Sequence, residues 1–349
     1  MILSESSVAS DIAKHLKDGF SLVQLDSVIR RIKRFFKNKL FNPYEFYDQI
    51  IKYVISNYKT KHSDKTVHIT FDHMFSHDNY TVFMISMRVG KQGIPLWFRC
   101  FDNINDSDAF NEELIKEGIS YVSNLFDSSY KLIFLADRWF KSISLMQHID
   151  SLGHTFFIRL KNNIKVFVYD KKEDHKIWKF IEDLKPLMYH SRIFRDVLLT
   201  NYSYKTNIVI SKKDSVDEPW IIVTNGDPKR AIKDYGYRFG SIETLFKNQK
   251  SNGFYIESIV KAGLDYFTSM YSITCFTILF LTILGADYSK NTKCYKKVKI
   301  TTHKHFIQNG VRIKKRVMSL FNTGLTLFHL AFNSSRYIRL PFSFILYDI

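Results

Sequence analysis

An uncharged apolar run constrains the fold of this chain more than any other feature. Residues 267–286 read FTSMYSITCFTILFLTILGA and carry no charge, with Asp265 and Asp287 near the borders. About twenty such residues are long enough to cross a bilayer as a helix. Serine and threonine dilute the run, however, and the sequence contains no second one. We therefore expect a helix buried in the core of a large folded protein.

Composition predicts a folded protein with an anionic partner. The chain has 349 residues, of which 45% are hydrophobic and 16% aromatic, so it is long enough for about two domains. Lys and Arg outnumber Asp and Glu by 51 to 34, and the sequence pI is about 9.5. Such an excess makes nucleic acid the first partner to consider and an anionic membrane the second, while a basic housekeeping enzyme is the alternative interpretation.

The cysteines predict a reducing compartment. Cys100, Cys275 and Cys294 are few, odd in number and widely spaced, which argues against a disulfide framework and a zinc site. The first twenty residues also lack the charged start and apolar core of a signal peptide. We expect a cytoplasmic protein.

Residues 1–62 read as helical, and residues 25–39 are the informative part. Arg30, Lys33, Arg34 and Lys37 share one face of the expected helix, opposite an apolar stripe. One interpretation is the solvated face of a packing helix. The other is a helix facing DNA phosphates in a helix-turn-helix, with Arg30 and Arg34 as contacts.

The middle of the chain predicts a mixed α/β sheet with flanking helices. Residues 66–160 follow the order β-β-β-α-β-α-β, and residues 161–230 resemble an antiparallel β unit inserted into that order. The remainder is mostly helical. We therefore predict a helical DNA-binding region (1–65), a core in two parts (66–160 and 233–349) and a β-rich insertion (161–232).

The C-terminal part is charged with one sign only. No acidic residue lies between Asp287 and Asp348, a span that contains twelve Lys or Arg residues. A segment of this length is poorly explained as a salt-bridged surface. It predicts a tract that faces phosphates.

Three carboxylates occupy positions suited to metal binding. Asp72 ends the strand pattern VHITFD, and Asp137 ends LIFLAD. Each could simply cap a turn, but open α/β sheets gather ligands where their strands end. Glu243 opens an expected helix with Ser241 as its N-cap.

The three carboxylates together suit phosphodiester chemistry. Lys247 and Lys250 follow Glu243 on the same helix face. These lysines could form a solvated ion-pair surface, or they could contact phosphates. Two divalent ions about 3.5–4 Å apart can activate an attacking oxygen and stabilise a leaving one. Mg²⁺ prefers such hard oxygen ligands.

The sequence resembles the DDE transposases of bacterial insertion sequences, in particular the IS-four-type cut-and-paste group with the signature Y-x2-R-x3-E-x6-K. Tyr235, Arg238, Glu243 and Lys250 match this signature, except that four residues separate Arg238 from Glu243. ITFDHMF and FLADRWF resemble the family's two aspartate strands. The likeness extends from about Thr66 to the C-terminus. The extra residue predicts that Arg238 lies in a loop before the helix.

The resemblance implies an RNase H-like core in which Asp72, Asp137 and Glu243 hold two Mg²⁺ or Mn²⁺ ions. It implies nicking of double-stranded DNA at the inverted-repeat ends of a mobile element, followed by strand transfer into target DNA. The partners would be those ends, the target and a second subunit in a synaptic homodimer. The protein would act at the nucleoid of a bacterial cytoplasm, without a membrane.

Further contacts follow from the same resemblance. The terminal phosphates of the DNA would be bound by Tyr235, Arg238 and Lys250, with Lys247 nearby. Trp139 could stack on an extruded base, although core packing is the more ordinary role for a tryptophan. Two alternatives stay open: an inactive, element-derived DNA-binding protein, and a peripheral membrane protein.

Overall fold

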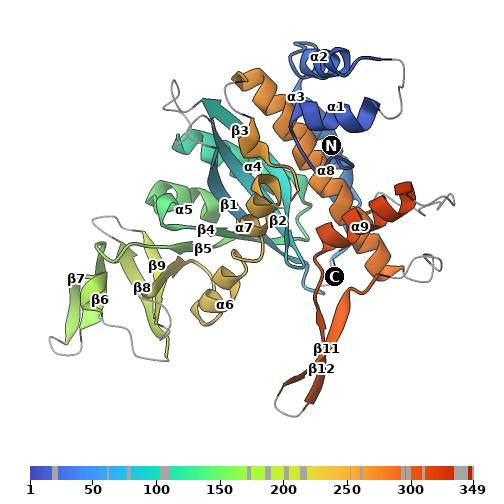
Figure 1. Cartoon of the computed structure of the whole chain (residues 1–349). Coiled ribbons are helices and arrows are strands. Elements are labelled where there is room, and N and C mark those ends of the chain that lie inside the picture. Colours follow the sequence, from blue (N-terminus) through green and yellow to red (C-terminus); the bar gives the residue numbers. More distant parts are fainter. Residues whose placement is uncertain are drawn as a thin grey trace. The chain divides into compact units, whose positions relative to one another are not determined.

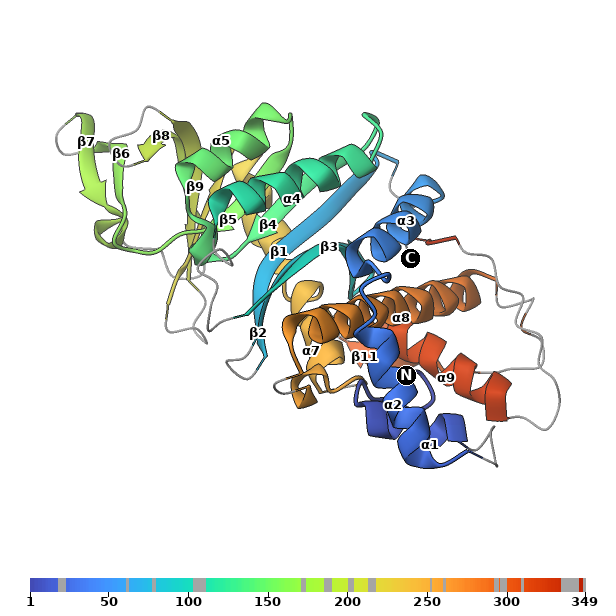
Figure 2. The same cartoon turned by 90° about the horizontal axis from the view of Figure 1, so that it is seen from above.

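The structure is a computed structural model in which the chain forms two compact units (Figures 1 and 2). Unit 1 comprises Met1–Ser63, His73–Phe110 and Gly240–Ile349, and unit 2 comprises Asp64–Asp72 and Asn111–Phe239. Both units are therefore discontinuous in sequence, and the predicted boundaries after residues 65, 160 and 232 stay predictions. The structure describes residues 1–17, 23–60, 63–76, 80–102, 111–170, 174–184, 190–199, 204–212, 218–251, 253–259, 262–291, 295, 300–308, 311–333 and 345–347.

Unit 2 is built on a mixed β-sheet, which confirms the predicted mixed α/β class. Its strands are β1 (Thr66–Ser76), β4 (Lys131–Ala136), β5 (Thr155–Arg159), β6 (Lys165–Asp170), β7 (His175–Phe180), β8 (Arg192–Leu199), β9 (Lys205–Ser211) and β10 (Trp220–Thr224). Their order is β1-β4-β5-β10-β9-β8-β6-β7. β1, β4 and β5 pair in parallel, and the other neighbours are antiparallel. The strands predicted as an insertion thus continue the sheet through the pairing of β10 with β5.

The parallel strands are short apolar runs joined by crossover helices. β4 reads KLIFLA, and all but its first residue is buried. Parallel neighbours need a crossover connection, and here α4 (Glu112–Leu125) precedes β4 while α5 (Ile143–Ser151) joins β4 to β5. Side-chain oxygens of Asn111 and Ser142 cap the two helices.

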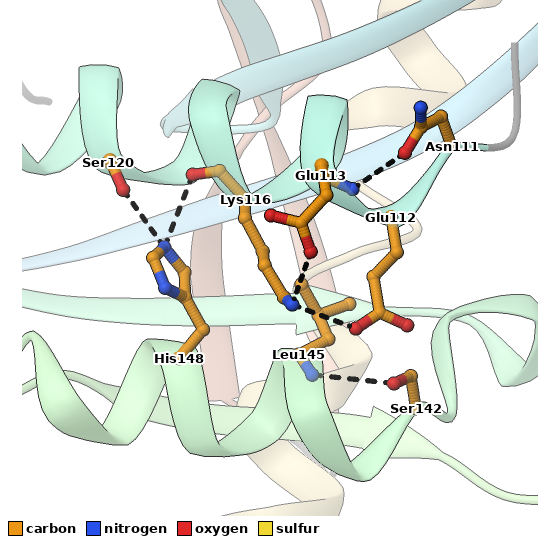
Figure 3. Close-up of polar contacts among 8 residues, drawn as sticks. All are labelled: Asn111, Glu112, Glu113, Lys116, Ser120, Ser142, Leu145 and His148. Atoms are coloured by element: carbon orange, nitrogen blue, oxygen red, sulfur yellow. Dashed lines mark hydrogen bonds and ion pairs between the residues drawn. The ribbon is translucent and has the colours of Figure 1, made fainter. Parts of the chain in front are cut away.

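Polar side chains join α4 to α5 (Figure 3). Nε2 of His148 on α5 lies 2.9 Å from the Ser120 hydroxyl and 3.2 Å from the Lys116 carbonyl oxygen on α4. The Lys116 ammonium lies 3.2 Å from Glu112 and 2.8 Å from Glu113. The ion pairs of Lys116 lie within α4, whereas the contacts of His148 join the two crossover helices and so support the positions of the strands that the helices connect.

A short helix, α6 (Ala231–Gly236), packs on the face of the sheet toward which the side chains of Ile133 and Leu135 point. Its anchors are Ala231 and Tyr235. They join a cluster of buried side chains from β4, β5, β9 and β10: Ile133, Leu135, Phe157, Val209 and Ile222. This packing brings the end of α6 to the sheet where the candidate aspartates lie.

In unit 1 the apolar run forms the long helix α8 (Leu264–Lys290), as predicted. By length and composition α8 could cross a membrane, but 83% of its most apolar window is buried within the protein. Threonines of this run are compatible with a buried helix because their hydroxyl groups donate hydrogen bonds to the backbone of that helix. Thr274, Thr277 and Thr282 each donate to the carbonyl four residues earlier, at 2.7–2.9 Å.

Glycines allow α9 (Leu320–Asn333) to approach α8 closely. A Cβ atom added to Gly285 would lie 1.9 Å from the Leu320 carbonyl oxygen. One added to Gly324 would lie 1.8 Å from the Leu281 carbonyl oxygen. The two backbones therefore touch at this crossing, and a side chain at either glycine would force them apart.

The N-terminal part of unit 1 is helical, as predicted, and the strands that follow form a hairpin. The elements are α1 (Ala9–Lys17), α2 (Leu25–Phe36), α3 (Pro43–Ser56), β2 (Tyr80–Val89) and β3 (Gln92–Asp102). β2 and β3 meet at a turn where Gly90 adopts a φ of 59°. The Ser272 hydroxyl of α8 donates to the Pro43 carbonyl of α3 at 2.7 Å.

Two differences from prediction lie in the C-terminal part. The part expected to be mostly helical is interrupted: α7 (Ile242–Lys250) ends at Lys250, and Tyr255 adopts a left-handed φ of 49° before the 3-10 turn Ile256–Ser258. A two-stranded ribbon, β11 (His303–Gln308) with β12 (Val311–Arg316), occupies part of the basic tract and was not predicted. Its sequence carries charge rather than a buried apolar face, so strand patterns did not reveal it.

Candidate active site

Two of the predicted carboxylates lie side by side on neighbouring parallel strands. Asp137 directly follows β4, but Asp72 lies within β1, which continues to Ser76 and does not end at Asp72 as predicted. The register of β1 and β4 pairs Phe71 with Ala136, so Asp72 and Asp137 are the next residues along each strand. Adjacent strands lie about 4.8 Å apart. Side chains alternate along a strand, so Asp137 continues the face of Ile133 and Leu135, toward α6. The sequence therefore places both carboxylates on one face through strand alternation and register.

A buried guanidinium bridges the two aspartates. Nη2 of Arg238 donates a hydrogen bond to Oδ2 of Asp72 and lies 4.0 Å from Oδ2 of Asp137. The side chain of Arg238 is only 6% exposed, whereas both carboxylates are partly open to solvent. Oδ1 of Asp137 also accepts a hydrogen bond of 2.7 Å from the Arg138 backbone N–H. Two negative charges thus share one positive charge, and a net charge of about −1 remains.

Arg238 lies in the turn after α6, as the extra residue in the signature predicted. Its backbone N–H donates to the Tyr235 carbonyl at 3.0 Å, which closes the last turn of the helix. The turn carries the arginine from the end of α6 to the aspartates. The additional residue before Glu243 is therefore accommodated outside any helix.

Tyr235 differs from its predicted role. We predicted a phosphate contact, but its side chain is 1% exposed and belongs to the cluster that holds α6 on the sheet. The ring of Trp220 meets it edge-on at a centroid distance of 5.3 Å. Burial raises the pKa of the Tyr235 phenol well above its usual value, with smaller effects from nearby Arg238 and Asp137. In this structure Tyr235 positions the helix that carries Arg238.

A second polar contact links α6 to β1, and sequence reasoning missed it. Asp234 is buried, with one oxygen 3.5 Å from Nε2 of His68 and the other 3.0 Å from Nε of Arg230. His68 lies on the same face of β1 as Asp72, because the two are four residues apart. The i,i+4 spacing of Arg230 and Asp234 could have revealed only the pair that these two residues form. Asp234 and Arg238 therefore fix the same helix end to the same strand.

Trp139 lies on the surface, next to the aspartates in sequence. It belongs to the 3-10 turn Arg138–Phe140 that follows Asp137, and it is 74% exposed. The Lys161 ammonium lies 5.5 Å from its ring centroid. The ordinary role that we considered for this tryptophan, core packing, is therefore wrong. An exposed aromatic ring beside a cation is a surface on which a base can stack.

The third predicted carboxylate, Glu243, lies in unit 1, on α7. Glu243 and Lys247 are exposed in successive turns of α7. Ser241 occupies the N-cap position, as predicted, but makes no side-chain capping bond to the helix. The Lys250 ammonium lies 2.8 Å from Glu257 and donates to the Phe75 carbonyl at 2.6 Å. The structure thus brings Asp72 and Asp137 together and leaves their relation to Glu243 a prediction.

The arginines predicted as DNA contacts lie on an exposed face of α2. Arg30, Lys33, Arg34 and Lys37 are all exposed, while Val28 and Phe36 are buried. This confirms the amphipathic helix and leaves its partner untested.

The aspartate pair suits a hard cation. No group of three or more His, Cys, Asp or Glu side chains is arranged to hold a metal ion within the part of the chain that the structure describes. Carboxylate oxygens are nevertheless the ligands that Mg²⁺ prefers, and the two aspartates already share a positive charge, that of Arg238. The donor set therefore fits a divalent ion if Arg238 withdraws.

Comparison with known proteins gives only distant likenesses. No protein-family model and no curated protein matches the chain. A solved structure described as a piggyBac transposase synaptic complex with hairpin DNA is 14% identical, with a TM-score of 0.44. That similarity covers 90% of this chain, which spans 65% of the length of the piggyBac chain.

A second similar structure is Marinitoga piezophila Argonaute in complex with 5′ OH guide RNA and target DNA. It is 15% identical, with a TM-score of 0.22, and the match covers 51% of this chain and 25% of that one. Both scores are too low to assign the chain to either fold.

Proposed function

We propose that this protein is a transposase that cuts and joins DNA by metal-dependent phosphoryl transfer on an RNase H-like core. The observation that carries the proposal is the pair Asp72 and Asp137, which follow equivalent positions of two parallel strands and share one cation. The spacing of Arg238, Glu243 and Lys250 in the sequence supports it. The excess of positive charge supports a DNA partner.

Asp72, Asp137 and Glu243 would hold two Mg²⁺ or Mn²⁺ ions, which when bound supply activation of the attacking oxygen and stabilisation of the leaving oxygen. The chain's own residues position the DNA. Arg238, once released from the aspartates, has a guanidinium suited to grip a phosphate bidentately. Tyr235 holds the helix from which that arginine projects.

Trp139 would stack on a base that leaves the helix near the cleaved bond. Its exposure and the adjacent Lys161 support this role. Exposed Lys247 would contact the phosphate backbone, and Lys250 would join it after leaving Glu257. Arg30 and Arg34 would bind the ends of the element through α2. A homodimer would hold both ends, in a bacterial cytoplasm.

The decisive experiment uses the DNA that flanks the gene, where the proposal expects inverted repeats. A labelled duplex carrying one repeat is incubated with the protein and Mg²⁺, and nicked and joined products are counted. Asp72→Asn, Asp137→Asn and Glu243→Gln should each lower cleavage at least about a hundredfold while DNA binding persists. Asp183→Asn, an exposed carboxylate of unit 2, is the matched control and should cleave normally.

Activity that survives in all three variants would refute the proposal. If the unaltered protein binds the repeats and never cleaves them with Mg²⁺ or Mn²⁺, the inactive DNA-binding alternative is correct. One observation favours that alternative: the site carries an arginine where a metal ion would bind.

A further inference from the structure

The β11–β12 ribbon is an exposed arm with cationic side chains on both faces and more of them on one face than on the other. Register pairs His303 with Arg316, His305 with Lys314 and Ile307 with Arg312. Paired residues point to the same side of a ribbon, and sides alternate along each strand. These three pairs therefore form one side, which we call the basic face. The other side carries Lys304 with Lys315, and Phe306 with Ile313.

Like charges oppose each other across the ribbon, which is unfavourable for an isolated hairpin. Lys304 faces Lys315, and both side chains are exposed. Such pairs destabilise a sheet, and a lone two-stranded hairpin is marginally stable in water. A polyanion on the ribbon would remove this repulsion, so the charge pattern indicates what the arm binds.

The base of the ribbon is firmly attached to the rest of unit 1. Arg316 donates from Nε to the Met318 carbonyl at 2.9 Å and from Nη2 to the Ser289 hydroxyl of α8. The Val317 backbone N–H donates to the Thr302 carbonyl at 2.9 Å. Arg316 is therefore a structural cation, which leaves His305, Arg312 and Lys314 as the outer basic residues of that face.

The outer part of the ribbon bonds only to itself within the described part of the chain. Between Lys304 and Lys315 the one side-chain hydrogen bond that the structure shows is from Lys315 to Gln308, at 3.0 Å. Ile307 lies on the basic face near the end of the strand and is 82% exposed. In Figure 1 the ribbon extends away from α8 and α9 of its own unit. Nothing described in unit 1 covers the basic face.

We propose that the ribbon lies in the major groove of double-stranded DNA, with its basic face toward the nucleic acid. The major groove is about 12 Å wide and admits a two-stranded β-ribbon. Arg312 and Lys314 reach phosphates or the acceptor edges of bases, and Ile307 offers an apolar contact of the kind that thymine methyl groups accept. The inference rests on one part of the proposed function, that DNA is the partner, and does not depend on the proposed chemistry of the aspartates.

The test measures binding of a labelled duplex in EDTA, so that catalysis plays no part. Arg312→Gln with Lys314→Gln should weaken binding at least about tenfold and lower the dependence of log affinity on log salt by about 2. Lys304→Gln with Lys315→Gln removes the same charge from the other face of the same ribbon. That matched control should change the affinity less than about threefold.

Competition identifies the groove. A ligand of the major groove, methyl green, should displace the protein from the duplex, and a ligand of the minor groove, netropsin, should not. Equal effects of the two double variants, or displacement by netropsin alone, would overturn the inference. A basic-face variant that binds DNA normally but no longer binds vesicles of anionic phospholipid would also overturn the inference. Thermal melting confirms that the exposed substitutions leave the fold intact.

The two proposals fail separately. If the aspartate variants cleave DNA normally while the basic-face variant still loses binding, only the chemistry is wrong. If the basic-face variant binds like the unaltered protein while the aspartate variants lose cleavage, only the ribbon inference is wrong.

Discussion

Arg238 donates a hydrogen bond to Asp72 across 166 residues of sequence, and the same nitrogen lies 4.0 Å from Asp137. The guanidinium therefore holds the place where the proposed chemistry requires a metal ion. An aspartate pair without a counter-ion would repel itself in a partly buried site. Arg238 relieves that repulsion, and a divalent ion must compete with it.

Removal of this arginine should strengthen metal binding. In Arg238→Gln we expect Mn²⁺ affinity to rise about tenfold, because a charge-assisted hydrogen bond contributes about 1.5–3 kcal/mol. Electron paramagnetic resonance of free Mn²⁺ measures the affinity without any reaction. Arg230→Gln is the control, since Arg230 lies just before α6 and pairs with Asp234 of that helix. Equal Mn²⁺ affinity in all three proteins would show that Arg238 does not compete with the ion.

Trp139 should contribute to binding of unpaired bases and not to stability. Trp139→Ala should weaken binding of a duplex with one flipped-out or unpaired base about tenfold, because stacking contributes about 1–3 kcal/mol per base. Trp139→Phe should retain most of the affinity. Fluorescence anisotropy gives the affinities, and Trp178→Ala, another exposed tryptophan of unit 2, is the control. A lowered melting temperature in Trp139→Ala would instead indicate a packing role.

The crossing of α8 and α9 should tolerate no side chain. Gly285→Ala should lower the free energy of unfolding by about 1–3 kcal/mol, because the added methyl group would overlap the Leu320 carbonyl. Urea denaturation measures the loss. Gly236→Ala places a methyl group where no atom lies within 4 Å, and it should be neutral or slightly stabilising. Similar stability of the two variants would mean that α8 and α9 separate readily.

His154 should make the protein less stable in mild acid. Burial lowers the pKa of this imidazole, and Nε2 lies 2.6 Å from the Ser123 hydroxyl. The folded state favours the neutral ring, whereas the unfolded chain takes up a proton near pH 6.5. Stability that is present above about pH 6.5 is therefore lost as the pH falls below that value.

The variant His154→Gln isolates this effect. Between about pH 7.5 and about pH 5.5 its free energy of unfolding should fall less than that of the unaltered protein. His190→Gln, at an exposed position, should show the full decrease. Identical decreases in all three proteins would mean that the titration of His154 is not linked to folding.

The aspartates could be located from sequence because the signals there are local. Asp72 and Asp137 each end a short apolar run in the sequence. The alternation of side chains along each strand, together with the order of the strands, is enough to place the two carboxylates near each other on one sheet. Tyr235 shows the limit of the same reasoning. The motif match of Tyr235 indicated a phosphate contact. Its burial, however, depends on side chains from four strands of the sheet, and no local sequence pattern encodes those contacts.

The ribbon and the contact of Asp234 with His68 escaped prediction for related reasons. Strand prediction relies on apolar side chains that alternate with polar ones, and the basic face has almost none. The partner of Asp234 lies 166 residues earlier, so only the fold reveals it. Charge patterns predicted a DNA-facing tract and could not show that it takes the form of two strands.

The attachment of α3 to α8 has a consequence for synthesis of the protein. Ser272 bonds to Pro43 across 229 residues, so at about 5–20 residues per second α3 emerges from the ribosome roughly 11–46 s before α8. During that interval the apolar face of α3 lacks the helix that later covers it. Completion of unit 1 is therefore limited by translation, and α3 is the segment that a chaperone would shield in the meantime.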